Sequence, residues 1–212
     1  MNLEKYQQYS RIARGLEKAD LVLKDARIVN VFTEEIIRGD IAIQDGIIAG
    51  IGSFHGKEER DLAGRYVCPG FIDSHLHLES TLVTPAELVT AASRHGTTTF
   101  IVDPHESANV SGLAGIDYIL DQTEDVKANV YVMMPSCVPA TAIDDNGCTL
   151  TAEEMAPYLH NNRILGLGEV MDSISVVQGE KSMHDKLELF EGRIRDGHAP
   201  FLEEGDLQKR SV

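Results

Sequence analysis

The sequence predicts an α/β fold in which a small β-rich unit precedes a series of parallel strands, each followed by a helix. Short β-branched runs fill residues 20–51. Beyond Tyr66, apolar segments of strand length alternate with segments of helical periodicity. Repeated strand–helix units favour a parallel sheet or barrel, in which ligand groups gather at the carboxyl ends of the strands.

Residues 1–66 are expected to form a helical lead-in, over residues 1–19, and then a small β-rich domain. Asp45-Gly46 stands between alternating apolar residues. This dipeptide favours a two-residue hairpin turn because both of its positions need positive φ. A sheet of roughly 50 residues encloses little core by itself, so we expect this domain to pack against another part of the protein.

Residues 67–200 are expected to alternate strands with helices. Thr84 and Thr151 each stand three residues before a Glu, a capping box that begins a helix. A further helix, capped by Ser182, would carry its apolar residues on one face: Met183, Leu187, Phe190 and Ile194. The expected strands are 71–78, 97–102, 129–134 and 164–171, and a fifth should finish at 197–200. A closed barrel needs eight strands and about 250 residues, so the chain is either a smaller open fold or half of a barrel.

Composition narrows the class of protein. The 212 residues include 34 acidic and 19 basic side chains, a net charge of −15, and such a surface repels nucleic acid. The three cysteines form no C-x-x-C pair, which indicates reduced thiols in a cytoplasm. The polar N-terminus resembles no signal peptide, and no apolar run approaches the ~20 residues of a membrane span. We therefore expect a cytoplasmic protein that binds neither nucleic acid nor membrane.

Two histidines one residue apart, His75 and His77, end the expected strand 71–78. Side chains at positions i and i+2 of a strand point the same way. Both imidazoles would therefore reach one point, as a metal site requires, and Asp73 and Glu79 would share that face. The alternative is a chance pair of histidines in a loop, and the pair alone leaves both interpretations open.

Other polar residues follow the later expected strands: Asp103, His105 and Glu106, then Glu169, then His198. Glu169 is flanked by apolar residues and would be badly placed without a cation. Each residue also has an ordinary interpretation. Glu169 could be a charge at a strand–loop junction. His105 and His198 could be solvated loop residues, and Asp103 before Pro104 could shape a turn.

The motifs of several familiar enzyme classes are missing or incomplete in this sequence. His77-Leu-Glu79 supplies the H-x-E of cytidine-deaminase-type zinc enzymes, but Cys137 has no second cysteine at the distance that their P-C-x-x-C requires. The sequence holds no G-x-S-x-G elbow, no G-x-x-x-x-G-K phosphate loop and no dinucleotide-binding G-x-G-x-x-G after a strand.

Five blocks of the sequence resemble the bacterial adenine deaminase family, within the amidohydrolase superfamily of metal-dependent hydrolases. They are PGFIDSHLHLES at 69–80, VDPHE at 102–106, SCVP at 136–139, GLGEVM at 166–171 and DGHAP at 196–200. Their order and spacing make the resemblance specific, and it extends over nearly the whole chain as far as Pro200.

The resemblance implies the first half of a (β/α)8 TIM-type barrel preceded by a small β-rich domain. The implied reaction is hydrolysis of adenine to hypoxanthine and ammonia, with two divalent transition metals, Mn²⁺ or Fe²⁺. It implies that His75 and His77 ligate metal, that Glu169 bridges the two metals, and that His198 binds the second. Four residues are expected to support these ligands or contact the purine: Glu79, Asp103, His105 and Glu106.

Part of the family pattern has no counterpart in this chain. The family's sixth-strand histidine and eighth-strand aspartate, the expected general base, are absent, and residues 201–212 match none of its blocks. We therefore expect a truncated or frameshifted reading frame, with the 212-residue chain poorly stable and inactive alone and the full-length form a homo-oligomer. Two other hypotheses stay open: an amidohydrolase acting on a cyclic amide, dihydroorotase-like or imidazolonepropionase-like, and a non-enzymatic pseudogene remnant.

Overall fold

A computed structural model describes residues 2–141 and 143–200, and the segment 201–212 lies outside the described residues. The chain divides into two compact units, Met1–Pro69 and a second that begins at Gly70. Within the described part of the chain, no helix is both long and apolar enough to cross a membrane.

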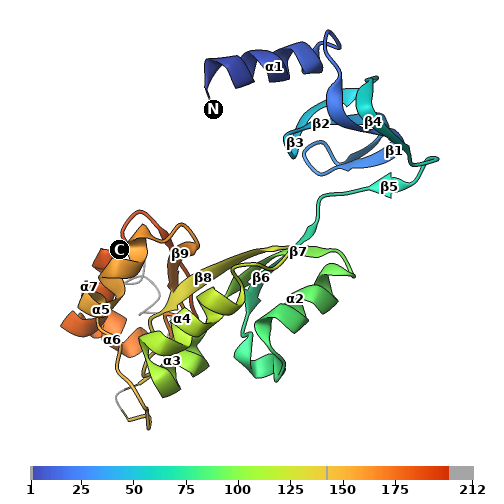
Figure 1. Cartoon of the computed structure of the whole chain (residues 1–212). Coiled ribbons are helices and arrows are strands. Elements are labelled where there is room, and N and C mark those ends of the chain that lie inside the picture. Colours follow the sequence, from blue (N-terminus) through green and yellow to red (C-terminus); the bar gives the residue numbers. More distant parts are fainter. Residues whose placement is uncertain (1, 142, 201–212) are drawn as a thin grey trace. The chain divides into compact units, whose positions relative to one another are not determined.

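The first unit is a small sheet with one helix (Figure 1). Its elements are α1 (Leu3–Ala13), β1 (Ala19–Asn30), β2 (Glu35–Gln44), β3 (Ile47–Gly52), β4 (Gly56–Asp61) and β5 (Tyr66–Val67). The strand order is β3-β2-β1-β4, and β5 also pairs with β1. β1 and β2 are antiparallel, as are β2 and β3, whereas β4 and β5 run parallel to β1.

Local chemistry explains where the elements of this unit begin and turn. Asn2 caps α1 by accepting a hydrogen bond from the Lys5 N–H. The predicted hairpin at Asp45-Gly46 is confirmed, because both residues have positive φ, 50° and 75°, between β2 and β3. The buried Asp40 carboxylate accepts a hydrogen bond from Lys24 Nζ at 2.5 Å and ties β2 to β1.

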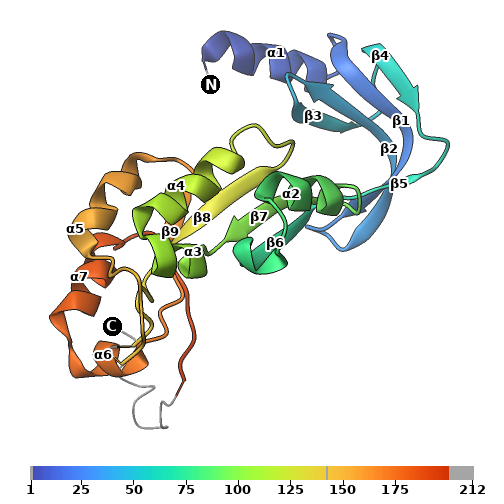
Figure 2. The same ribbon diagram turned by 60° about the horizontal axis from the view of Figure 1, so that its bottom comes forward.

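The second unit is built on a curled sheet of five parallel strands in the order β10-β9-β8-β7-β6. They are β6 (Phe71–Leu76), β7 (Thr97–Val102), β8 (Asn129–Pro135), β9 (Ile164–Gly168) and β10 (Ile194–Arg195). The helices are α2 (Pro85–Ser93), α3 (His105–Ser111), α4 (Leu113–Gln122), α5 (Ala152–Met155), α6 (Ser173–Gln178) and α7 (Lys181–Leu189), with 3-10 turns at Glu79–Thr81 and Ala156–His160. In Figure 2, α2 to α4 lie next to strands β6 to β8, and α5 to α7 form a separate group beyond these three strands.

One hydrophobic core joins this sheet to its helices. Alternate residues of β8, Val130, Val132 and Met134, are buried against the helices. Phe100 of β7 and Leu167 of β9 extend the same core. This packing aligns the carboxyl ends of neighbouring strands, which is where the candidate ligands lie.

Five details of the expected secondary structure are wrong. The fifth strand, expected to finish at 197–200, is β10 and already ends at Arg195. β6 ends at Leu76 because the chain then enters the 3-10 turn Glu79–Thr81, so Glu79 does not continue the strand alternation. β9 ends at Gly168, before Glu169. The helix expected to be capped by Ser182 begins two residues earlier, at Lys181 with Glu180 as its N-cap. Ile194 belongs to β10 and not to that helix, because the helix ends at Leu189.

Candidate metal centre

The predicted ligands lie at the carboxyl ends of neighbouring parallel strands. His75 belongs to the end of β6, and His77 follows it directly. His105 stands in the first turn of α3, just after β7, where the sequence suggested only a strand end. Glu169 follows β9, and His198 follows β10. The topology therefore brings together residues up to 123 positions apart in the chain.

Glu169 is the centre of the cluster, and its backbone is in an unusual conformation. Its φ is 45°, a left-handed geometry that costs a non-glycine residue roughly 1–3 kcal/mol. The Glu169 carbonyl oxygen accepts a hydrogen bond from Ser136 Oγ at 2.8 Å, and its N–H donates to Asp196 Oδ1 at 3.2 Å. These contacts hold the backbone of the turn, and the Glu169 side chain is only 4% exposed.

Three histidines surround Oε1 of Glu169. The Nε2 atoms of His75, His77 and His198 lie 3.1, 3.4 and 3.3 Å from this oxygen. His75 Nε2 and His77 Nε2 are themselves 3.1 Å apart. The convergence expected of the His75–His77 pair is therefore present, although His77 lies just beyond the end of the strand.

The hydrogen bonding of His77 indicates that a cation fits between these groups. Its Nδ1 lies 2.9 Å from the carbonyl oxygen of Asp103, and because a carbonyl only accepts, Nδ1 carries the proton. In the neutral ring, Nε2 then presents a lone pair to the Glu169 carboxylate, an arrangement that repels without a positive charge between the two. One point lies about 2 Å from His75 Nε2, His77 Nε2 and Glu169 Oε1, the length of a zinc–nitrogen bond.

The other oxygen of the Glu169 carboxylate faces a different pair of side chains. His105 Nε2 lies 3.1 Å from Oε2, and Cys137 Sγ lies 3.9 Å from it. The sequence places Cys137 in the SCVP block and excludes it from a C-x-x-C pair, but it does not predict this contact. The available signal was its position, because Cys137 follows β8 as the other ligand candidates follow their own strands.

Buried acidic side chains are crowded around the cluster. Asp103 is 1% exposed, and neither of its carboxylate oxygens has a hydrogen-bond partner among the described residues. Burial raises the pKa of Asp103 well above its usual range, and the nearby carboxylates of Glu169 and Asp196 raise it further. Burial also raises the pKa of the Cys137 thiol, and Asp103 and Glu169 reinforce that shift. Such a concentration of acidic groups is suited to holding cations.

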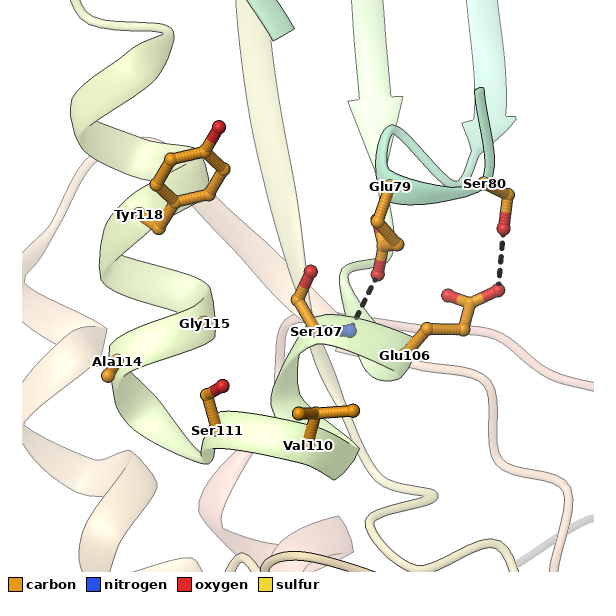
Figure 3. Close-up of a pocket in the computed structure, with 9 residues that line it drawn as sticks. All are labelled: Glu79, Ser80, Glu106, Ser107, Val110, Ser111, Ala114, Gly115 and Tyr118. Atoms are coloured by element: carbon orange, nitrogen blue, oxygen red, sulfur yellow. Dashed lines mark hydrogen bonds between the residues drawn. The ribbon is translucent and has the colours of Figure 1, made fainter. Parts of the chain in front are cut away.

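A pocket of about 500 Å³ adjoins the cluster between the 3-10 turn Glu79–Thr81, α3 and α4 (Figure 3). Glu79 Oε1 accepts a hydrogen bond from the Ser107 N–H at 3.0 Å, and Ser80 Oγ donates to Glu106 Oε1 at 2.9 Å. Glu106 also reaches the cluster, because its Oε2 lies 3.4 Å from His105 Nε2. Glu79 therefore lines this pocket and, contrary to the expectation from strand alternation, does not share a strand face with His75.

The chain is similar to known adenine deaminases. It is 56% identical over 207 residues to the adenine deaminase of Desulfitobacterium hafniense, a match that covers 98% of this chain and 36% of that protein. It is 49% identical over 188 residues to the adenine deaminase of Geobacillus kaustophilus, covering 88% of this chain and 33% of the relative. The chain thus spans about a third of the length of the curated relatives that it matches.

A solved structure supports the fold. The N-acyl-D-glutamate deacylase of Bordetella bronchiseptica, whose structure was determined with zinc and a phosphonate inhibitor, superposes with a TM-score of 0.53 at 20% identity. The superposition covers 86% of this chain and 45% of the deacylase. The model of the amidohydrolase family matches residues 66–206, including the first part of the segment 201–212 that sequence analysis placed outside the family. The chain therefore belongs to the amidohydrolase family, whose members are metal-dependent hydrolases.

Proposed function

We propose that this chain supplies the N-terminal part of an adenine deaminase, which hydrolyses adenine to hypoxanthine and ammonia. The observation that carries the proposal is the 56% identity to an adenine deaminase over nearly the whole chain. In this proposal the five-stranded sheet is the first part of a (β/α)8 barrel, and the remaining strands lie in a region that the curated relatives have beyond this match.

The proposed site holds two divalent transition metals, Mn²⁺ or Fe²⁺. His75, His77 and Glu169 are the proposed ligands of the first metal, and the spacing of their donor atoms supports that role. Glu169 is proposed to bridge the two metals, and His198 is the proposed ligand of the second metal. When bound, such metals lower the pKa of water so that hydroxide is available at neutral pH.

The chain's own residues would prepare the site for this chemistry. Glu169 supplies a fixed negative charge between the histidines, and its left-handed backbone turns the carboxylate toward them. The Asp103 carbonyl keeps the proton of His77 on Nδ1, so that Nε2 is free to bind. Glu79 and Glu106, at the neighbouring pocket, are proposed to accept hydrogen bonds from the N–H groups of the purine. The general base is expected from the rest of the barrel.

A chimera tests the proposal. The N-terminal third of the Desulfitobacterium hafniense adenine deaminase is replaced by residues 1–200 of this chain, the protein is loaded with Mn²⁺, and hypoxanthine is measured by chromatography. We expect the chimera to deaminate adenine within about 10-fold of the parent rate, an activation difference of about 1.4 kcal/mol. The His75→Ala chimera should lose at least about 100-fold, more than removing an outer contact of a metal ligand typically costs.

His95→Ala is the matched control, because His95 is exposed and lies outside the cluster. It should retain the rate of the unsubstituted chimera. A chimera that folds and binds manganese, yet leaves adenine unchanged, would refute the proposed function.

A further inference from the structure

A lysine of α7 reaches the end of β8, close to the candidate metal centre. Lys186 is only 7% exposed, and its Nζ donates a hydrogen bond to the carbonyl oxygen of Ser136 at 2.8 Å. Ser136 Oγ in turn donates to the carbonyl oxygen of Glu169 at 2.8 Å. Two successive hydrogen bonds therefore link α7 to the backbone of Glu169.

We propose that Lys186 is a positioning residue, which fixes Ser136 and, through it, the turn that directs the Glu169 carboxylate toward the histidines. This role rests on the proposed metal site and leaves the ligands of that site unchanged. Lys186 itself contacts neither the metals nor the substrate.

The turn at Glu169 depends on support from other parts of the chain. Its φ of 45° is unfavourable for a residue other than glycine. Ser136 supplies that support with two groups, because its hydroxyl binds Glu169 and its N–H donates to the Gly168 carbonyl oxygen at 3.0 Å. The third polar group of Ser136, its carbonyl oxygen, is held by Lys186. The lysine therefore fixes the residue on which the turn depends.

The burial of this ammonium group is costly, which favours a specific role for it. A buried charge is destabilising unless it is paired, and Lys186 forms no ion pair with a carboxylate of the described residues. Burial accordingly lowers the pKa of Lys186, although nearby acidic groups oppose the shift. Costly groups of this kind are found preferentially at functional sites.

The alternative is that Lys186 only attaches α7 to the sheet. The packing of the helix argues against this role. Met183 and Phe190 lie on either side of Lys186 in the chain, and both are buried in the same hydrophobic core as the strands. The helix is therefore held without the ammonium group, and a methionine of similar length and shape can replace the lysine.

Manganese binding separates the possible roles by the sign of the change. Removal of a positive charge near the site would, by electrostatics alone, strengthen the binding of a cation. Loss of a positioning residue should instead weaken binding. Loss of a mere helix anchor should lower the melting temperature and leave the affinity of the folded chain unchanged.

The metal-free 212-residue chain and its Lys186→Met variant are titrated with Mn²⁺ by calorimetry at neutral pH, and the melting temperature of each is recorded. We expect about a 5-fold rise in the dissociation constant, the effect of one lost hydrogen bond, and no fall in the melting temperature. Lys181→Met is the matched control, because it makes the same substitution on the same helix at a side chain that is 87% exposed. It should leave both quantities unchanged.

A double-mutant cycle tests the route through Ser136. Lys186→Met and Ser136→Ala interrupt the same two hydrogen bonds, so together they should weaken binding by about 5-fold and not by the roughly 25-fold of independent effects. Lys186→Arg keeps a cationic donor and should bind manganese more tightly than Lys186→Met. If Lys186→Met does not fold, Lys186→Gln, which leaves a shorter polar side chain beside the carbonyl, is held to the same expectation.

Two results would overturn this inference and leave the proposed metal ligands intact. One is equal or tighter manganese binding by the folded Lys186→Met chain, and the other is additivity in the cycle. An unsubstituted chain that binds no manganese would overturn the inference and count against the metal site in the proposed function as well.

Discussion

Ser136 Oγ donates a hydrogen bond to the carbonyl oxygen of Glu169 at 2.8 Å and so links the end of β8 to the left-handed residue after β9. The Ser136 N–H in turn donates to the Gly168 carbonyl oxygen at 3.0 Å. The position of the Glu169 carboxylate therefore depends on a neighbouring strand as well as on its own, and substitutions around this contact should alter metal binding.

Ser136→Ala should weaken metal binding without unfolding the chain. The substitution removes one hydrogen bond to a strained backbone position, a loss of about 1 kcal/mol. We expect about a 5-fold rise in the dissociation constant for Mn²⁺, measured by calorimetry on the metal-free chain. Ser93→Ala is the matched control, because Ser93 Oγ has no hydrogen-bond partner among the described residues. Equal affinity of Ser136→Ala and the unsubstituted chain would show that the contact does not position Glu169.

Glu169→Gln should abolish tight metal binding while leaving the metal-free fold intact. The amide keeps the size of the side chain but removes the charge that the histidines surround, so we expect the affinity for Mn²⁺ to fall by at least about 100-fold. The carboxylate is buried among other acidic groups, and its removal should not lower the melting temperature of the metal-free chain.

Glu153→Gln controls for the loss of one negative charge, because Glu153 is exposed in the first turn of α5. It should leave metal affinity unchanged. A Glu169→Gln chain that bound manganese as tightly as this control would exclude Glu169 as a ligand.

The sequence predicts the regular elements better than the ends of the strands that carry the site. The expected strand 97–102 coincides with β7, and both hydrogen bonds of the capping box expected at Thr151 are present. These features depend on local periodicity and hydrogen bonding, which neighbouring residues determine. By contrast, the expected strand through Glu169 is three residues too long, because its end is set by contacts with Ser136 and Asp196 on other strand ends.

The same distinction explains which residues of the metal centre can be predicted from the sequence and which cannot. The His75–His77 pair is detectable because its spacing alone brings the rings together. Cys137 and His105 approach Glu169 only through the order of β7, β8 and β9 in the sheet, and no spacing in the sequence encodes that order.

Gly168→Ala should destabilise the chain by about 1–3 kcal/mol, the usual effect of overpacking. A Cβ at this position would lie 2.0 Å from Asp103 Oδ2 and 2.7 Å from Met133 Cβ. Chemical denaturation of the metal-free chain measures the loss. An alanine variant as stable as the unsubstituted chain would show that Asp103 does not pack against Gly168.

Combining Gly168→Ala with Asp103→Ala should restore part of that stability. The second substitution removes the closer of the two clashes and also a buried carboxylate without a hydrogen-bond partner. The contact with Met133 remains, so we expect incomplete recovery. A double-mutant cycle gives the coupling energy, and additive effects of the two substitutions would contradict the packing.

Lys186→Met should change how stability depends on pH. Burial lowers the pKa of Lys186 below its ordinary 10.5. Between the lowered value and 10.5, the unfolded chain holds a proton that the folded chain has released, so this lysine makes stability rise with pH in that window. We therefore expect the free energy of unfolding of the unsubstituted chain to increase relative to Lys186→Met as the pH approaches 10.5. Lys181→Met is the control, since that side chain is 87% exposed. A difference between the unsubstituted chain and Lys186→Met that stays constant over this range would show that the buried ammonium carries no desolvation cost.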